Sequence, residues 1–194
     1  QTERDVLLVR VITDQAEGWA ECVAIADPLY SSEFTDGAQR VVADHLLPRL
    51  FAADRLNADL VAPLLEPVRG HRMAKAAVET AVLDAQLKAA GVPLSRHLGA
   101  TATHVDSGVS VSIYDAVPEL LDAVAGYLDA GYRRLKLKIE PGWDIEPVAA
   151  VRERFGDDVL LQVDANSAYT RSDARHLALL DAFGLLLIEQ PLDE

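Results

Sequence analysis

The second half of the chain repeats a strand followed by a helix about every 26 residues. Strands joined by helices lie parallel, because each connection must return the chain to the same end of the sheet. The repeat therefore predicts an α/β fold. Either the first half of a (β/α)8 barrel or a doubly wound open sheet fits this spacing. We expect strands at 107–113, 134–139, 159–163 and 185–189, and helices at about 117–130, 145–155 and 172–183.

The first half has a different pattern, which predicts a small α+β unit. Segments 5–12 and 19–25 are apolar and separated by turn residues, as in a β-hairpin. Helical spacing follows at 36–51, with Asp36 as its cap and Pro48 near its far end, and again at 71–90, before Gly91 and Pro93. We therefore expect two domains, residues 1–104 and 105–194.

Composition excludes several classes of function. The net charge of −13 argues against binding nucleic acid or an anionic membrane through a basic surface. No apolar run approaches the roughly 20 residues needed to cross a bilayer. The single cysteine, Cys22, excludes an internal disulfide and fits a reducing cytoplasm. We expect a cytoplasmic protein with a small-molecule substrate.

Polar side chains gather where the predicted parallel strands end, which is where α/β folds carry their chemistry. They are Ser110 and Ser112, Lys136 and Lys138, Asp164 and Asn166, and Glu189 and Gln190. Lys138 and Asp164 are 26 residues apart, and Asp164 and Glu189 are 25 apart. One step of the repeat thus carries each group onto the next, so we expect them at similar heights on neighbouring strands.

These residue types favour proton transfer beside a metal ion. Lys136 and Lys138 share one face of their strand, so each should lower the pKa of the other. Burial should lower both pKa values further, and a lysine brought toward neutrality can act as a base. Asp164 and Glu189 offer the oxygen ligands that Mg²⁺ or Mn²⁺ prefer. A divalent metal beside a lysine base suits removal of a proton from the carbon next to a carboxylate.

Each residue also has an ordinary structural interpretation. Two lysines in K-x-K spacing often point to solvent from an edge strand, an aspartate at a strand end often caps a helix, and Glu189 could simply end its strand. The shared spacing favours function for the set. The five histidines lack metal-site spacing, so we expect surface or structural roles for His176 and the others.

The motifs "RLKLKIEPGWD" (134–144), "LLQVDANSAY" (160–169) and "LLLIEQPL" (185–192) resemble the second to fourth barrel strands of the enolase superfamily, in its muconate-lactonizing subgroup. With "PLYSSE" (28–33) and "GHRMAK" (70–75), the whole chain is similar to the N-acylamino acid racemase / o-succinylbenzoate synthase family. This resemblance implies an α+β capping domain followed by strands 1–4 of a TIM-like barrel.

The resemblance also implies roles for individual residues. Lys138 would be the acid/base catalyst, and Lys136 would support it and stabilise the enolate. Asp164 and Glu189 would bind Mg²⁺ or Mn²⁺. Ser110, Asn166 and Tyr30 would contact or support the carboxylate substrate, with a packed loop aromatic as the alternative for Tyr30. The implied activity is o-succinylbenzoate synthesis, a step of menaquinone biosynthesis, or N-acylamino acid racemisation.

Compared with this family pattern, we expect the chain to be truncated at both ends, lacking the first strand of the capping domain and the second half of the barrel. A third metal carboxylate would be expected near position 214 and an opposing lysine near 238. We therefore expect the 194-residue chain alone to be inactive, and the full-length protein to form a homo-oligomer, either a dimer or an octamer. Alternatives are a dipeptide epimerase, a muconate cycloisomerase-like enzyme, or a non-catalytic barrel fragment.

Overall fold

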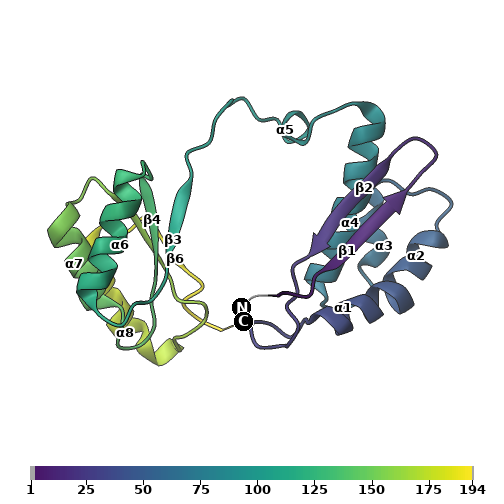
Figure 1. The fold of residues 1–194 in the computed structure, drawn as a ribbon. Helices are drawn as coiled ribbons and strands as arrows, with labels where there is room; N and C mark the ends of the chain where they lie inside the picture. The colour runs from purple at the N-terminus through teal and green to yellow at the C-terminus, as the bar shows by residue number, and fades with distance from the viewer. Residues whose placement is uncertain (1–2, 194) are drawn as a thin grey trace. The chain divides into compact units, whose positions relative to one another are not determined.

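The computed structural model describes residues 3–193, which divide into two compact units with the boundary between Thr103 and His104 (Figure 1). Within the described residues, no helix combines the length and apolar character needed to pass through a lipid bilayer. The elements of the first unit are β1 (Leu7–Ile12), β2 (Glu17–Cys22), α1 (Thr35–Val41), η1 (Val42–Leu46), α2 (Leu47–Phe51), α3 (Ala58–Leu65), α4 (Arg72–Ala90) and α5 (Leu94–His97).

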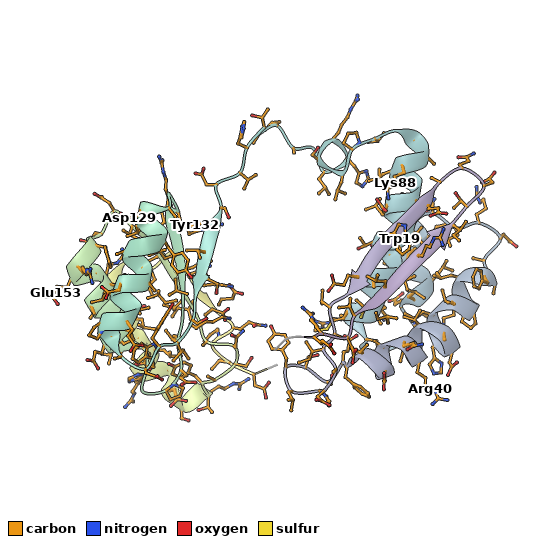
Figure 2. All side chains as sticks on the ribbon, viewed as in Figure 1. Trp19, Arg40, Lys88, Asp129, Tyr132 and Glu153 are labelled. Atoms are coloured by element: carbon orange, nitrogen blue, oxygen red, sulfur yellow. The ribbon has the colours of Figure 1, made fainter. Side chains whose placement is uncertain are left out.

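In the first unit, the predicted hairpin forms and packs on the long helix α4. β1 and β2 pair antiparallel, with Leu7 opposite Cys22. Alanines of α4 lie in the core and present little side-chain bulk, so the strands approach the helix closely. The backbone N–H of Trp19 donates to Asp84 on α4, which also accepts from Lys88; Trp19 and Lys88 are labelled in Figure 2.

The predicted helix 36–51 is nearly continuous but differs from expectation at its start. It begins at Thr35 after Phe34, so Asp36 lies in the first turn rather than at the cap. Pro48 does not interrupt it, because the chain passes through a π-helical turn (η1) and Pro48 falls near the start of α2, where its missing N–H is tolerated. The expected helix at 71–90 is α4, which ends at Gly91 in the left-handed conformation.

The second unit contains a four-stranded parallel sheet in the order β3-β4-β5-β6. Its elements are β3 (Gly108–Val111), α6 (Val117–Asp129), β4 (Arg134–Lys138), α7 (Ile145–Phe155), β5 (Leu160–Asp164), η2 (Arg171–Asp173), α8 (Ala174–Leu177), η3 (Ala178–Phe183) and β6 (Ile188–Glu189). The predicted helix at 172–183 is wrong in detail, since only 174–177 is α-helical and 3₁₀ turns flank it.

One face of this sheet carries the apolar core. Leu135, Leu137 and Leu161 are fully or almost fully buried, and α6 and α7 cover this face (Figure 1). Burial of each such side chain stabilises the fold by roughly 1.5–3 kcal/mol. Side chains alternate along a strand, so a core on this face leaves Lys136 and Lys138 on the other.

At the end of the sheet where β5 begins, Arg152 of α7 holds the connecting loops together. Its guanidinium donates to the carbonyls of Phe183 (2.8 Å), Gly184 (3.2 Å), Gly156 (3.1 Å) and Val159 (2.7 Å). One side chain thus joins the end of α7 to the start of β5 and the end of η3.

The close approach of β2 to α4 makes Gly18 irreplaceable. A Cβ there would lie 2.0 Å from the Ala81 carbonyl oxygen and 2.4 Å from the Ala85 nitrogen. We expect Gly18→Ala to lower the free energy of unfolding by about 3 kcal/mol or more, because backbone atoms must move. Urea denaturation followed by circular dichroism measures this.

The matched control is Gly126→Ala on α6, where nothing lies within 4 Å of the added methyl group. Alanine is favoured over glycine in a helix by about 1 kcal/mol, so this variant should be as stable as the wild type or more so. Equal stability of the two variants would contradict the packing of β2 on α4.

Candidate active site at the strand ends

Three charged residues form a row across the ends of three parallel strands. The register pairs Lys138 on β4 with Asp164 on β5, and Asp164 with Glu189 on β6. This is the arrangement that the 26- and 25-residue spacings predict. Neighbouring strands lie about 4.8 Å apart, so side chains of the row on the same face can touch.

Lys138 is held by two oxygen acceptors of the next strand and its loop. Its ammonium donates to Asp164 Oδ2 at 2.6 Å and to Asn166 Oδ1 at 2.5 Å. The amine therefore has a defined position at the end of β4.

Lys136 lies two residues earlier on the same face and bridges both carboxylates. Its Nζ is 3.2 Å from Asp164 Oδ2 and 3.1 Å from Glu189 Oε2. Burial lowers the pKa of Lys136, but the carboxylates of Glu189 and Asp164 outweigh burial and raise this pKa above its usual value. The expected lowering of the Lys136 pKa was wrong, because that expectation rested on burial and the neighbouring lysine and left out the two carboxylates.

Asp164 is the most buried charged group of the row, with 1% of its surface exposed. Burial raises its pKa, but hydrogen bonds from Lys138, the backbone N–H of Asn166, and Lys136 outweigh burial and hold the pKa below its usual value. A buried carboxylate kept ionised in this way is a strong cation-binding group.

The loops after β5 and β6 have unusual backbone conformations. Asn166 (φ 42°), Ser167 (φ 66°) and Gln190 (φ 42°) all have left-handed backbones. Such conformations are costly for residues other than glycine and are best tolerated by asparagine and aspartate. The turn aims the Asn166 side chain at Lys138, and Asn166 Nδ2 lies 3.4 Å from Gln190 Oε1.

Ser110 in β3 and Ser112, directly after β3, line different pockets. A pocket of about 520 Å³ at the strand ends is lined by Ser112 together with Lys138, Asp164 and Asn166. Ser110 pairs in register with Lys136 and lines a separate pocket of about 230 Å³. Ser112 therefore shares a pocket with Lys138 and Asp164, although only Ser110 was singled out as a substrate contact. Tyr30 lies in the first unit and is exposed, and its substrate role stays a prediction.

The structure adds a polar cluster around the buried Asp144 that the spacing of the strands does not predict. Asp144 precedes α7 and accepts from Tyr169 Oη and His176 Nε2, both at 2.7 Å. His176 thus has the structural role predicted for it. Asp144 stands directly before a helix that carries Glu146 and Pro147 in its first turn, which is a recognisable capping signal.

The two carboxylates of the row suit a divalent cation. The ammonium of Lys136 lies within 3.2 Å of oxygens from both, so one cation at this position reaches Asp164 and Glu189 together. Mg²⁺ is commonly bound through one or two carboxylates, with water and substrate completing its shell. Residues 3–193 contain no cluster of three or more histidine, cysteine, aspartate or glutamate side chains arranged for a metal.

Comparisons with known proteins agree with this geometry. The family model "Mandelate racemase / muconate lactonizing enzyme, N-terminal domain" matches residues 1–99, and "Enolase C-terminal domain-like" matches residues 119–194. An N-succinylamino acid racemase from Amycolatopsis is 61% identical over all of this chain and 53% of its own length. An o-succinylbenzoate synthase from Geobacillus kaustophilus is 42% identical over 99% of this chain and 51% of its own.

A solved structure gives the same result for the fold. An enolase superfamily member from Listeria innocua superposes with a TM-score of 0.90 at 38% identity, covering 97% of this chain and 51% of that one. The chain spans about half the length of the curated relatives it matches.

Replacing Asn166 separates its backbone role from its side-chain role. Asn166→Gly and Asn166→Ala both remove the oxygen that accepts from Lys138, but only glycine adopts φ 42° without strain. We expect Asn166→Ala to have a free energy of unfolding about 1 kcal/mol below that of Asn166→Gly, measured by urea denaturation. An alanine variant as stable as the glycine variant would rule out the left-handed turn.

Proposed function

The chain belongs to the mandelate racemase / muconate lactonizing enzyme family of the enolase superfamily, and from this we propose that it carries half of an active site for removing a proton next to a carboxylate. The observation that supports this most strongly is the row of Lys138, Asp164 and Glu189 across three parallel strands. The activity proposed is that of the full-length protein, because the relatives are about twice as long as this chain.

The proposed substrates are N-succinylamino acids, and the proposed reaction is their racemisation. This choice rests on the 61% identity to an N-succinylamino acid racemase. Formation of o-succinylbenzoate is a second candidate, supported by relatives of that activity at 42% identity. Both reactions begin with loss of a proton from the carbon beside a carboxylate, so one lysine base serves either.

In the proposed mechanism, Lys138 is the base. Its Nζ stands at the strand ends, held by Asp164 Oδ2 and Asn166 Oδ1, and must release one proton before it can accept another from the substrate. Lys136 remains cationic beside it, because the carboxylates of Glu189 and Asp164 raise its pKa against the effect of burial. This fixed positive charge beside Lys138 attracts the carboxylate substrate.

Asp164 and Glu189 are the proposed ligands of Mg²⁺ or Mn²⁺, and Asn166 supports Lys138. A bound divalent ion would supply positive charge where negative charge develops on the substrate carboxylate. The first unit is proposed to act as a capping domain over the substrate, with Tyr30 as a contact, and Ser110 as a contact from β3. The full-length protein is proposed to be a homo-oligomer.

Exchange of the substrate α-proton tests the proposed base. In D₂O with Mg²⁺, the full-length protein should exchange the α-proton of an N-succinylamino acid, followed by NMR. Lys138→Ala should slow exchange by about 10³-fold, in the range of general base catalysis. Lys88→Ala is the matched control, because Lys88 is an exposed lysine paired with Asp84 on α4, and should exchange normally. Normal exchange by Lys138→Ala would refute the assignment.

Calorimetric titration with Mg²⁺ tests the proposed ligands in the same full-length protein. Asp164→Ala and Glu189→Ala should each weaken Mg²⁺ binding by at least about 100-fold. Loss of a residue that only hydrogen-bonds to a metal ligand can weaken metal binding by up to about 100-fold, and loss of the ligand itself should weaken it at least as much. Glu153→Ala, on the exposed side of α7 (Figure 2), should bind as the wild type does. Indifference of Mg²⁺ binding to both ligand changes would exclude the proposed metal site.

A further inference from the structure

Tyr169 contacts the segments that follow all three strands of the charged row. It lies in the loop after β5, with 2% of its surface exposed. Its backbone N–H donates to the Pro191 carbonyl oxygen at 3.1 Å, in the segment after β6. Its phenol oxygen is 2.7 Å from Asp144 Oδ2, in the segment after β4.

Asp144 is itself held in place by several hydrogen bonds. It is buried, with 5% of its surface exposed, and its two oxygens accept from the Ile145 N–H, Tyr169 Oη and His176 Nε2. Burial raises the pKa of Asp144, but these hydrogen bonds hold it below its usual value. Burial and the facing carboxylate raise the pKa of Tyr169, so the phenol remains the donor to an ionised acceptor.

The backbone of the strand ends has matching cross-strand bonds. The Ile139 N–H donates to the Asp164 carbonyl oxygen, and the Ala165 N–H donates to the Glu189 carbonyl oxygen, both at 3.0 Å. The donor of each bond directly follows a member of the row, since Ile139 follows Lys138 and Ala165 follows Asp164. A displacement of any of the three segments therefore moves the proposed base or a proposed ligand.

We propose that Tyr169 is a positioning residue, which acts through Asp144 to hold Lys138, Asp164 and Glu189 at one height. The inference rests on the proposed function, and no role was assigned to Tyr169 or Asp144 there. His176 shares Asp144 Oδ2 and so ties the short helix α8 to the same point. Misplacement of reacting groups by about 1 Å can reduce rates by about 100-fold, so a link of this kind affects turnover.

Tyr169→Phe in the full-length protein tests the proposal, because it removes only the hydroxyl and keeps the ring and the bond to Pro191. We expect kcat for α-proton exchange to fall about 10-fold or more, with KM changed less than about 2-fold. We also expect amide hydrogen exchange at Ile139 and Ala165 to accelerate about 10-fold. Tyr132→Phe is the matched control, since Tyr132 precedes β4 at the other end of the strand (Figure 2), and should leave all three quantities unchanged.

Asp144→Ala, which removes the oxygen that accepts from the Tyr169 phenol, provides a second test of the same link. It should reproduce the loss in kcat, and the double variant should lose no more than the larger single loss, because both changes break one interaction. Fully additive losses, or wild-type kcat and amide exchange in Tyr169→Phe, would overturn the proposal. If the wild type shows no α-proton exchange, the proposed function fails, and amide hydrogen exchange in Tyr169→Phe alone tests the positioning role. Faster amide exchange at both Ile139 and Ala165 then supports that role, and unchanged amide exchange refutes it.

Discussion

The register of three parallel strands determines where each charged group of the candidate site lies. Because β4, β5 and β6 pair so that Lys138 is opposite Asp164 and Asp164 is opposite Glu189, residues about 26 positions apart become neighbours. A shift of one residue would exchange the faces of a strand, placing leucines among the carboxylates and lysines in the core. The packing of α6 and α7 on the apolar face fixes this register, and so it also fixes which side chains lie on the polar face.

The charges of the row and of Lys136 compensate one another. Two ammonium groups and two carboxylates lie within hydrogen-bond distance, so burial of Asp164 is offset by Lys138 and Lys136. Removal of one partner would leave a buried charge unpaired, which is costly. The same arrangement explains why a cation suits this position, because Asp164 and Glu189 already share the ammonium of Lys136.

The polar residues behind the row complete this arrangement. Asp144 begins α7 and receives a phenol and an imidazole from the next strand–helix connection, so one buried carboxylate joins two loops. The left-handed turns at Asn166 and Gln190 lie in the neighbouring loops. Backbone strain of this kind persists only where surrounding contacts over-determine the conformation, and the cross-strand bonds to Asp164 and Glu189 provide such contacts.

Much of this arrangement is predictable from sequence because its signals are local and repeat. Apolar segments at a regular spacing define the parallel strands, and side-chain alternation along 134–139 separates the lysines from the leucines. The same spacing places Lys138, Asp164 and Glu189 in one row. The chain's sequence alone also carries the motifs of the enolase superfamily, and the family matches agree with them.

Only the tertiary structure decided the electrostatics and the supporting contacts. The pKa of Lys136 is raised because carboxylates from two other strands reach it, and sequence spacing does not state those distances. The link between Tyr169 and Asp144 joins residues 25 apart through loops whose shape depends on packing. Periodicity reports which face a residue occupies, whereas the partners of a side chain depend on how segments distant in sequence meet.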